Sequence, residues 1–389
     1  MTTTIIISFC VLLLLSYVFD LTSSKTKVPS VILLLLLGWL VRQVTVWSDI
    51  HLPDFSPILP VLGTVGLILI VLEGSLELEL NPSKFGLVRK SFFGALVPMV
   101  ALGVLLAWAF RFLGHFGWKD SLISAIPLCV ISSAIAIPSV RNLSSNCREF
   151  VIYESSFSDI LGVLIFNFFA LNDQINGHSI SHFALQLVLM IVVSVVATIA
   201  LSFLLSKIEH HVKFVPIILL VVLIYSVSKI YHLPGLLFIL LFGLSIGNLD
   251  ELKGWKWVDK IAPDQLKKEV VKLKDLTTEA AFLIRAVFFL LFGYLIETAE
   301  VLNADTFVWA IAIVSGILLL RALQLLLSKL PLQPLLFVAP RGLITILLFL
   351  SIEPAHTISI VNKSLILQVM LLTAVVMMFG LMTHKSQNQ

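Results

Sequence analysis

Blocks of about twenty apolar residues, the length of helix that crosses the hydrocarbon of a bilayer, recur along the whole chain between short polar segments. This pattern predicts an all-α polytopic membrane protein with thirteen membrane-spanning helices. The eighth and ninth spans are divided only at Pro234, and the alternative is that they form one helix. The approximate limits are 4–21, 28–47, 57–76, 90–113, 120–140, 148–171, 182–208, 213–231, 234–249, 276–298, 305–329, 335–352 and 364–384.

The composition supports a membrane protein over a soluble helical domain. Apolar residues make up 59% of the 389 residues and charged residues 13%, whereas about a quarter of a soluble domain is charged. The net charge of +3 is small and scattered, so no nucleic-acid partner is indicated. The three cysteines offer no disulfide framework. The partners that composition indicates are therefore the lipid bilayer and a transported solute.

The basic residues predict the orientation. With the N-terminus outside, the predicted loops place eighteen Lys and Arg on the cytoplasmic side and five outside. The C-terminus is then cytoplasmic, and the membrane is expected to be the inner (plasma) membrane of the cell. One longer hydrophilic segment, 249–278, is expected to be a solvated and partly helical cytoplasmic linker.

One carboxylate lies where a charge is costly. Asp159 is about 16 Å into the sixth span, near the midplane, where an ionised side chain costs about 2.5–3.5 kcal/mol on insertion scales. Ser155 precedes it by four positions and Gly162 follows by three, so they share its helix face, and Ser158 is adjacent. Asp159 can bind a proton or a cation, with Ser158 and Ser155 as further oxygen ligands. The alternative is that Asp159 is a structural polar residue whose hydrogen bonds are satisfied within a helix interface.

A second acid, Glu154, points about 140° away from Asp159 on the same helix. A structural ion pair is expected for it. Arg285, Arg321 and Arg341 lie at comparable depth in the tenth, eleventh and twelfth spans, and depth does not select among them. Glu73, toward the cytoplasmic end of the third span, is either interfacial or near the site.

Two spans carry helix-breaking residues. The fifth contains Ile137-Pro138, and the twelfth contains Pro340 and Gly342 on either side of Arg341. Proline removes a backbone hydrogen bond, and paired interruptions are the best sequence pointer to a transporter site. We expect both helices to be interrupted at these residues. The span count leaves open whether the two halves are related as repeats.

Four segments, in order, resemble the monovalent cation–proton antiporter superfamily, specifically its sodium–proton exchanger branch. The resemblance covers nearly the whole chain. The segments are the acidic glycine motif from Val71 to Leu80, the stretch from Tyr153 to Asp159 that resembles Glu-Ser-Leu-x-Asn-Asp, the Phe-rich run from Phe282 to Gly293, and Ala339 to Leu343, which resembles the Leu-Arg-Gly element.

The resemblance implies a fold of two inverted repeats with an ion-translocating core and a dimerisation part, hence a homodimer. The core would comprise about 90–171 and 305–384, and the dimerisation part about 1–80 and 182–298. It also implies that Asp159 binds the transported ion, Na⁺ in this branch, and that Glu154 pairs with Arg321. No cofactor is expected.

Two departures from the family pattern bear on mechanism. The Thr-Asp-Pro of the crossing helix is here Ala136-Ile137-Pro138, and Ser158 replaces the Asn before the aspartate. A single titrating carboxylate predicts electroneutral exchange of one cation per proton. Potassium–proton exchange (or Li⁺ as the cation), symport of another solute, and a channel or sensor that kept the fold remain alternatives. An enzyme is not indicated.

Overall fold

The computed structural model describes residues 2–49, 53–79, 82–172, 176–208, 212–249 and 263–383, and within them it contains helices and no strands. Residues 250–262, in the first half of the predicted linker, and the C-terminal tail lie outside these ranges. The α-helices are α1 (Thr2–Thr26), α2 (Ser30–Trp47), α3 (Leu59–Glu77), α4 (Phe85–Gly114), α5 (Trp118–Cys129), α6 (Ser133–Ser139), α7 (Ser145–Leu171), α8 (Gly177–Lys207), α9 (Phe214–Ile230), α10 (Gly235–Gly247), α12 (Pro263–Tyr294), α13 (Thr298–Val301), α14 (Ala304–Leu327), α15 (Leu343–Leu350) and α16 (Lys363–Thr383). Four 3-10 helices are described: η1 (Ser56–Ile58), η2 (Pro82–Lys84), η3 (Leu335–Phe337) and η4 (Pro354–His356).

The predicted fold class is confirmed. Within the described residues, ten stretches are long and apolar enough to cross a membrane by length and composition, and α9 and α10 are shorter apolar helices. The remaining predicted span, 335–352, contains η3 and α15. The division at Pro234 also holds, because α9 ends at Ile230 and α10 begins at Gly235. The chain is a multi-pass membrane protein.

The helix of the tenth span is longer than expected. α12 begins at Pro263, thirteen residues before the predicted start at 276. Its first part buries Leu266, Val270 and Leu273 at helical spacing, while Lys268 and Lys272 are exposed. The second half of the predicted linker is therefore an amphipathic extension of a membrane helix.

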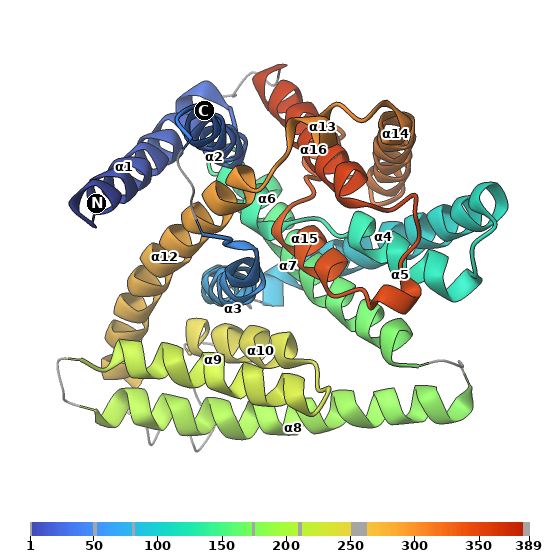
Figure 1. The fold of residues 1–389 in the computed structure, drawn as a ribbon. Helices are drawn as coiled ribbons and strands as arrows, with labels where there is room; N and C mark the ends of the chain where they lie inside the picture. Colours follow the sequence, from blue (N-terminus) through green and yellow to red (C-terminus); the bar gives the residue numbers. More distant parts are fainter. Residues whose placement is uncertain are drawn as a thin grey trace. The chain divides into compact units, whose positions relative to one another are not determined.

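The chain divides into two compact units. One comprises Met1–Thr64, Lys90–Gly162 and Leu283–Gln389, and the other Val65–Arg89 and Val163–Phe282. The predicted functional division, with a core at 90–171 and 305–384, follows other boundaries and stays a prediction. In the smaller unit, α10 packs against α8 and α9 (Figure 1).

In the larger unit, α14 packs on α16, and α5 packs on α15. The same unit holds a close helix crossing between α2 and the C-terminal half of α12. A Cβ atom added at Gly38 would lie 2.1 Å from the Leu290 carbonyl oxygen, and one at Gly293 would lie 2.4 Å from that of Leu35. Small residues permit such backbone approach, which is a main source of packing energy between membrane helices.

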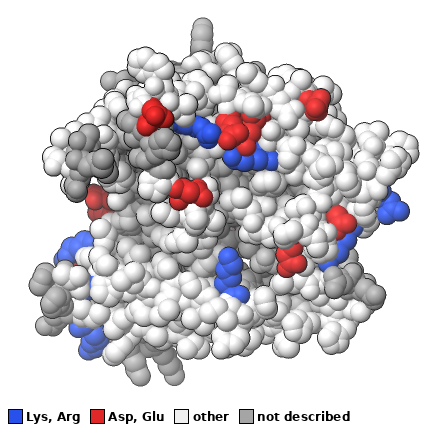
Figure 2. Space-filling model, in the orientation of Figure 1, with Lys and Arg blue, Asp and Glu red and all other residues white. Residues whose placement is uncertain are grey.

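Uncharged side chains cover most of the face drawn in Figure 2. Large apolar side chains such as Leu319 and Val308 are each 72% exposed, as expected of helices whose outer surface meets hydrocarbon.

Candidate functional site

The fifth span is interrupted between α5 and α6. Val130 and Ser132 have extended backbone conformations, and their segment makes no helical hydrogen bonds across the break. The Ile131 N–H donates to Ser158 Oγ at 2.8 Å, and the Ser132 N–H donates to the Pro340 carbonyl at 2.9 Å. Partners from distant segments thus satisfy the freed backbone groups, as a buried break requires.

This break differs from the sequence expectation. Ile137 and Pro138 were expected to mark it, but both lie within α6, and the interruption is at 130–132. The position is set by the tertiary partners Ser158 and Pro340 rather than by the local effect of the proline ring. The non-helical segment of this span is accordingly 130–132, and Ala136-Ile137-Pro138 is part of α6.

The twelfth span is interrupted where the sequence predicts it. Residues 338–342 are not helical and separate η3 from α15. A Cβ atom at Gly342 would lie 2.6 Å from Ile135 Cδ1 and 2.9 Å from Ser132 Oγ. Glycine at this position therefore lets the two breaks approach each other closely.

Arg341 joins the two breaks. Its Nε donates to the Leu128 carbonyl at 2.8 Å, Nη2 to the Cys129 carbonyl at 3.3 Å, and Nη1 to the Ala339 carbonyl at 2.8 Å. The first two are the last carbonyls of α5, where the helix dipole carries negative partial charge. Its own backbone N–H donates to Thr373 Oγ1 at 3.0 Å.

Asp159 lies on α7 at this crossing and is 1% exposed. Its Oδ2 accepts a short hydrogen bond from Ser133 Oγ, at the first position of α6. Its Oδ1 is buried and has no hydrogen-bond partner among the described residues. Buried polar atoms are almost always satisfied, so Oδ1 is suited to receive a proton or a cation.

The other expected ligands, Ser158 and Ser155, are buried, but their hydroxyl groups bond to backbone groups and not to Asp159. Ser158 Oγ accepts the Ile131 N–H, and Ser155 Oγ donates to the Ile152 carbonyl of its own helix at 3.4 Å. Gly162, on the helix face of Asp159, leaves no open space for an ion, because Val130 Cγ2 would lie 2.4 Å from a Cβ there. Ser133 is the residue that the sequence interpretation missed. Its only sequence signal is the Ser132-Ser133 pair in an apolar span.

Glu154 forms a two-pronged ion pair with Arg321. The Oε1–Nη1 and Oε2–Nη2 distances are 3.0 and 2.9 Å, and the side chains are 1% and 4% exposed. Arg321 Nε also donates to the Leu335 carbonyl at 2.6 Å. Of the three arginines that depth left open, Arg321 is thus the one that contacts this glutamate. This is the pair that the family resemblance implies.

The remaining candidates lie on other helices. Arg285 is buried in α12, and Glu73 is half-buried in α3. Their expected participation in the site stays a prediction.

Comparisons with known proteins identify the family and the fold. The family model described as "Sodium/hydrogen exchanger, transmembrane" matches residues 10–384. A structure of the sodium proton antiporter MjNhaP1 from Methanocaldococcus jannaschii at pH 8 is 19% identical, with a TM-score of 0.67 over 98% of this chain and 96% of that one. An electron-microscopy structure of the same antiporter is 17% identical, with a TM-score of 0.71 over 97% and 95% of the two chains. These solved structures share the fold, and the family match over nearly the whole length shows that the chain belongs to the sodium/hydrogen exchanger family of transmembrane cation–proton antiporters.

Proposed function

We propose that this chain exchanges one Na⁺ for one H⁺ electroneutrally, with Asp159 binding the two ions alternately. The observation that carries the proposal is the state of the Asp159 carboxylate, in which Oδ2 accepts from Ser133 and the buried Oδ1 has no partner among the described residues. A carboxylate that is buried in hydrocarbon is stabilised when a proton or a cation neutralises it.

Charge counting supports the stoichiometry. Asp159 is neutral with a proton bound, and its site is neutral again with Na⁺ bound. Glu154 is held by Arg321 through two hydrogen bonds and contributes a constant charge. Each half of the cycle therefore moves the same charge, and the membrane potential does no net work on exchange.

The Ser133 hydroxyl supplies a second oxygen at the proposed ion site, beside the Asp159 carboxylate. Its hydroxyl donates to Oδ2, so it stabilises the ionised carboxylate before a cation arrives. A hydroxyl both donates and accepts, and rotation about its C–O bond presents a lone pair to a bound cation. Ser133 is thereby a direct ligand, and Ser158 and Ser155 support the site through the backbone contacts described above.

The setting of the protein follows the positive-inside rule. We place the N-terminus outside and the C-terminus in the cytoplasm of a cell whose inner (plasma) membrane holds the transporter, because the basic residues of the predicted loops concentrate on one side. A homodimer, and transport of Na⁺ and H⁺ without a cofactor, are what the family leads us to propose.

The decisive experiment measures proton flux in liposomes that contain the purified protein, on addition of Na⁺, Li⁺ or K⁺ outside. We expect the Na⁺-driven proton flux to be the same when the membrane potential is clamped at zero and at a large negative value. A flux that changes with voltage would refute the one-carboxylate mechanism. Flux driven best by K⁺ would favour potassium–proton exchange, and no flux with any cation would favour a member that kept only the fold.

Variants at two serines separate the ligand from the scaffold. Ser133→Ala is expected to raise the Na⁺ concentration for half-maximal flux at least tenfold, and Ser133→Thr, which keeps the hydroxyl, to change it little. Ser139→Ala is the matched control, since that hydroxyl lies on the same helix α6 and donates to the Ile135 carbonyl at 2.7 Å, not to the carboxylate. An unchanged Na⁺ dependence in Ser133→Ala would remove Ser133 from the site.

A further inference from the structure

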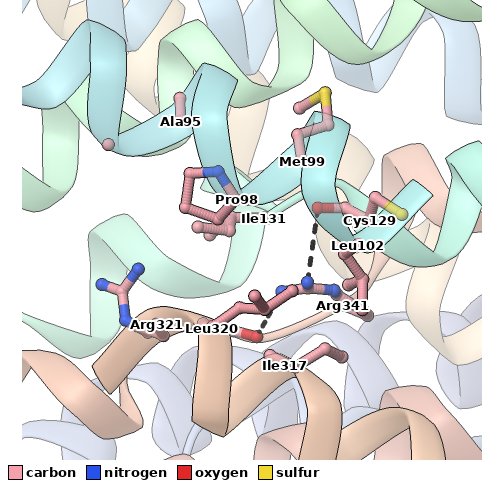
Figure 3. Close-up of a pocket in the computed structure, with 12 residues that line it drawn as sticks. Ala95, Pro98, Met99, Leu102, Cys129, Ile131, Ile317, Leu320, Arg321 and Arg341 are labelled. Atoms are coloured by element: carbon pink, nitrogen blue, oxygen red, sulfur yellow. Dashed lines mark hydrogen bonds between the residues drawn. The ribbon is translucent and has the colours of Figure 1, made fainter. Parts of the chain in front are cut away.

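A small pocket lies beside the crossing of the two breaks (Figure 3), and Asp159 is not among the residues that line it. Its charged lining residues are Arg321 and Arg341, and none of its lining residues is acidic. Apolar side chains from α4 and α14, including Pro98, Leu102, Ile317 and Leu320, form much of the rest of the wall. About 20 Å³ of this space is open to the centre of a water-sized sphere, so a particle somewhat larger than a water molecule fits.

The two arginines differ in how their charge is balanced. Arg321 is neutralised by both oxygens of Glu154. Arg341 is 3% exposed, and among the described residues its guanidinium donates hydrogen bonds only to the carbonyl oxygens of Leu128, Cys129 and Ala339. No ion pair among the described residues includes it. The C-terminus of a helix supplies about half a negative charge, so α5 balances this cation only in part.

Arg341 also has hydrogen-bonding capacity left. A guanidinium carries five N–H donors, and Arg341 uses one on Nε, one on Nη1 and one on Nη2. One N–H on each terminal nitrogen therefore has no partner among the described residues. Figure 3 shows the Arg341 side chain among the labelled lining residues, so its guanidinium forms part of the pocket wall.

We propose that this pocket binds a small monovalent anion of the halide class, chloride foremost, as a fixed counter-ion to Arg341. A chloride ion accepts hydrogen bonds from the two remaining N–H groups and balances the positive charge of Arg341. The apolar walls suit a weakly hydrated halide, whereas a divalent oxyanion would need more donors than the pocket has. The anion is not transported. It stabilises the crossing of the breaks, and this role goes beyond the exchange assigned to Asp159.

The test is thermal unfolding of the purified full chain in detergent, at fixed pH, Na⁺ concentration and ionic strength, with chloride or bromide replacing gluconate. The expected result is a midpoint temperature that rises saturably with chloride and bromide and stays unchanged with gluconate. No halide-specific rise would overturn the proposal, and would mean that the carbonyl contacts alone balance Arg341. The readout needs no transport, so it is independent of the Asp159 mechanism.

Paired variants locate the ion. Leu320→Phe narrows the pocket and is expected to weaken the halide effect at least tenfold in concentration. Leu319→Phe, one position along α14 on a side chain that is 72% exposed and does not line the pocket, should keep it. An equal halide effect in both variants would place the ion elsewhere and refute the site. If Leu320→Phe does not fold, anomalous scattering from bromide-soaked wild-type crystals tests the site instead. The proposal requires a bromide peak beside the Arg341 terminal nitrogens, and the absence of that peak would refute it.

Discussion

The buried pair between Glu154 and Arg321 is the contact whose energy the structure predicts most directly. Two hydrogen bonds of 3.0 and 2.9 Å join the side chains, which are 1% and 4% exposed. Removing one member of such a pair leaves an uncompensated buried charge, at a cost of about 3–5 kcal/mol. We expect Arg321→Met and Glu154→Gln each to lower the free energy of unfolding by an amount near this range.

The double variant separates the pair from its surroundings. Replacement of both charges by neutral groups of similar size is often nearly neutral, so Glu154→Gln/Arg321→Met should be less destabilised than the sum of the single variants by about 2 kcal/mol or more. The remaining loss comes from the Leu335 carbonyl, which Arg321 Nε contacts at 2.6 Å. The measurement is reversible unfolding in mixed lipid–detergent micelles.

A solvent-exposed pair gives the matched control. Arg42 and Glu297 lie 3.0 Å apart with side chains 28% and 58% exposed, so their coupling should be about 0–1 kcal/mol. Strict additivity at Glu154 and Arg321, or a coupling no larger than that of the control pair, would refute the reasoning.

Three further outcomes are expected. Asp159→Asn, which keeps the volume and loses the titratable group, should abolish exchange in liposomes while the unfolding transition remains; wild-type flux would remove the central claim. Because protons and Na⁺ compete for one carboxylate, the Na⁺ concentration for half-maximal flux should rise as pH falls, and a pH-independent value would show separate sites. Gly293→Val should destabilise the fold by several kcal/mol, because its Cβ would lie 2.4 Å from the Leu35 carbonyl oxygen, whereas Gly86→Val, with open space around its Cα, serves as the helix-propensity control in thermal unfolding.

The sequence by itself determined the properties that depend on local hydrophobic length and local backbone chemistry. Apolar runs of bilayer length gave the helices, and Pro234 gave the division between α9 and α10. The depth of Asp159 in the membrane stays a prediction. The break at Pro340 and Gly342 was also predictable, since a proline and a glycine two residues apart together disfavour a continuous helix.

Only the tertiary structure decided the choices that depend on partners far apart in the chain. Three arginines fit the depth of Glu154, and the tertiary structure brings Arg321, on α14 and 167 residues away, into contact with it. The first break falls at 130–132 rather than at Pro138, because Ser158 and Pro340 accept the N–H groups freed there. Ser133 contacts Asp159 for the same reason, because the position of the break sets the direction in which α6 presents its side chains. The hydrophobic pattern of the span carries no information about that direction, so it does not predict which serine contacts the carboxylate.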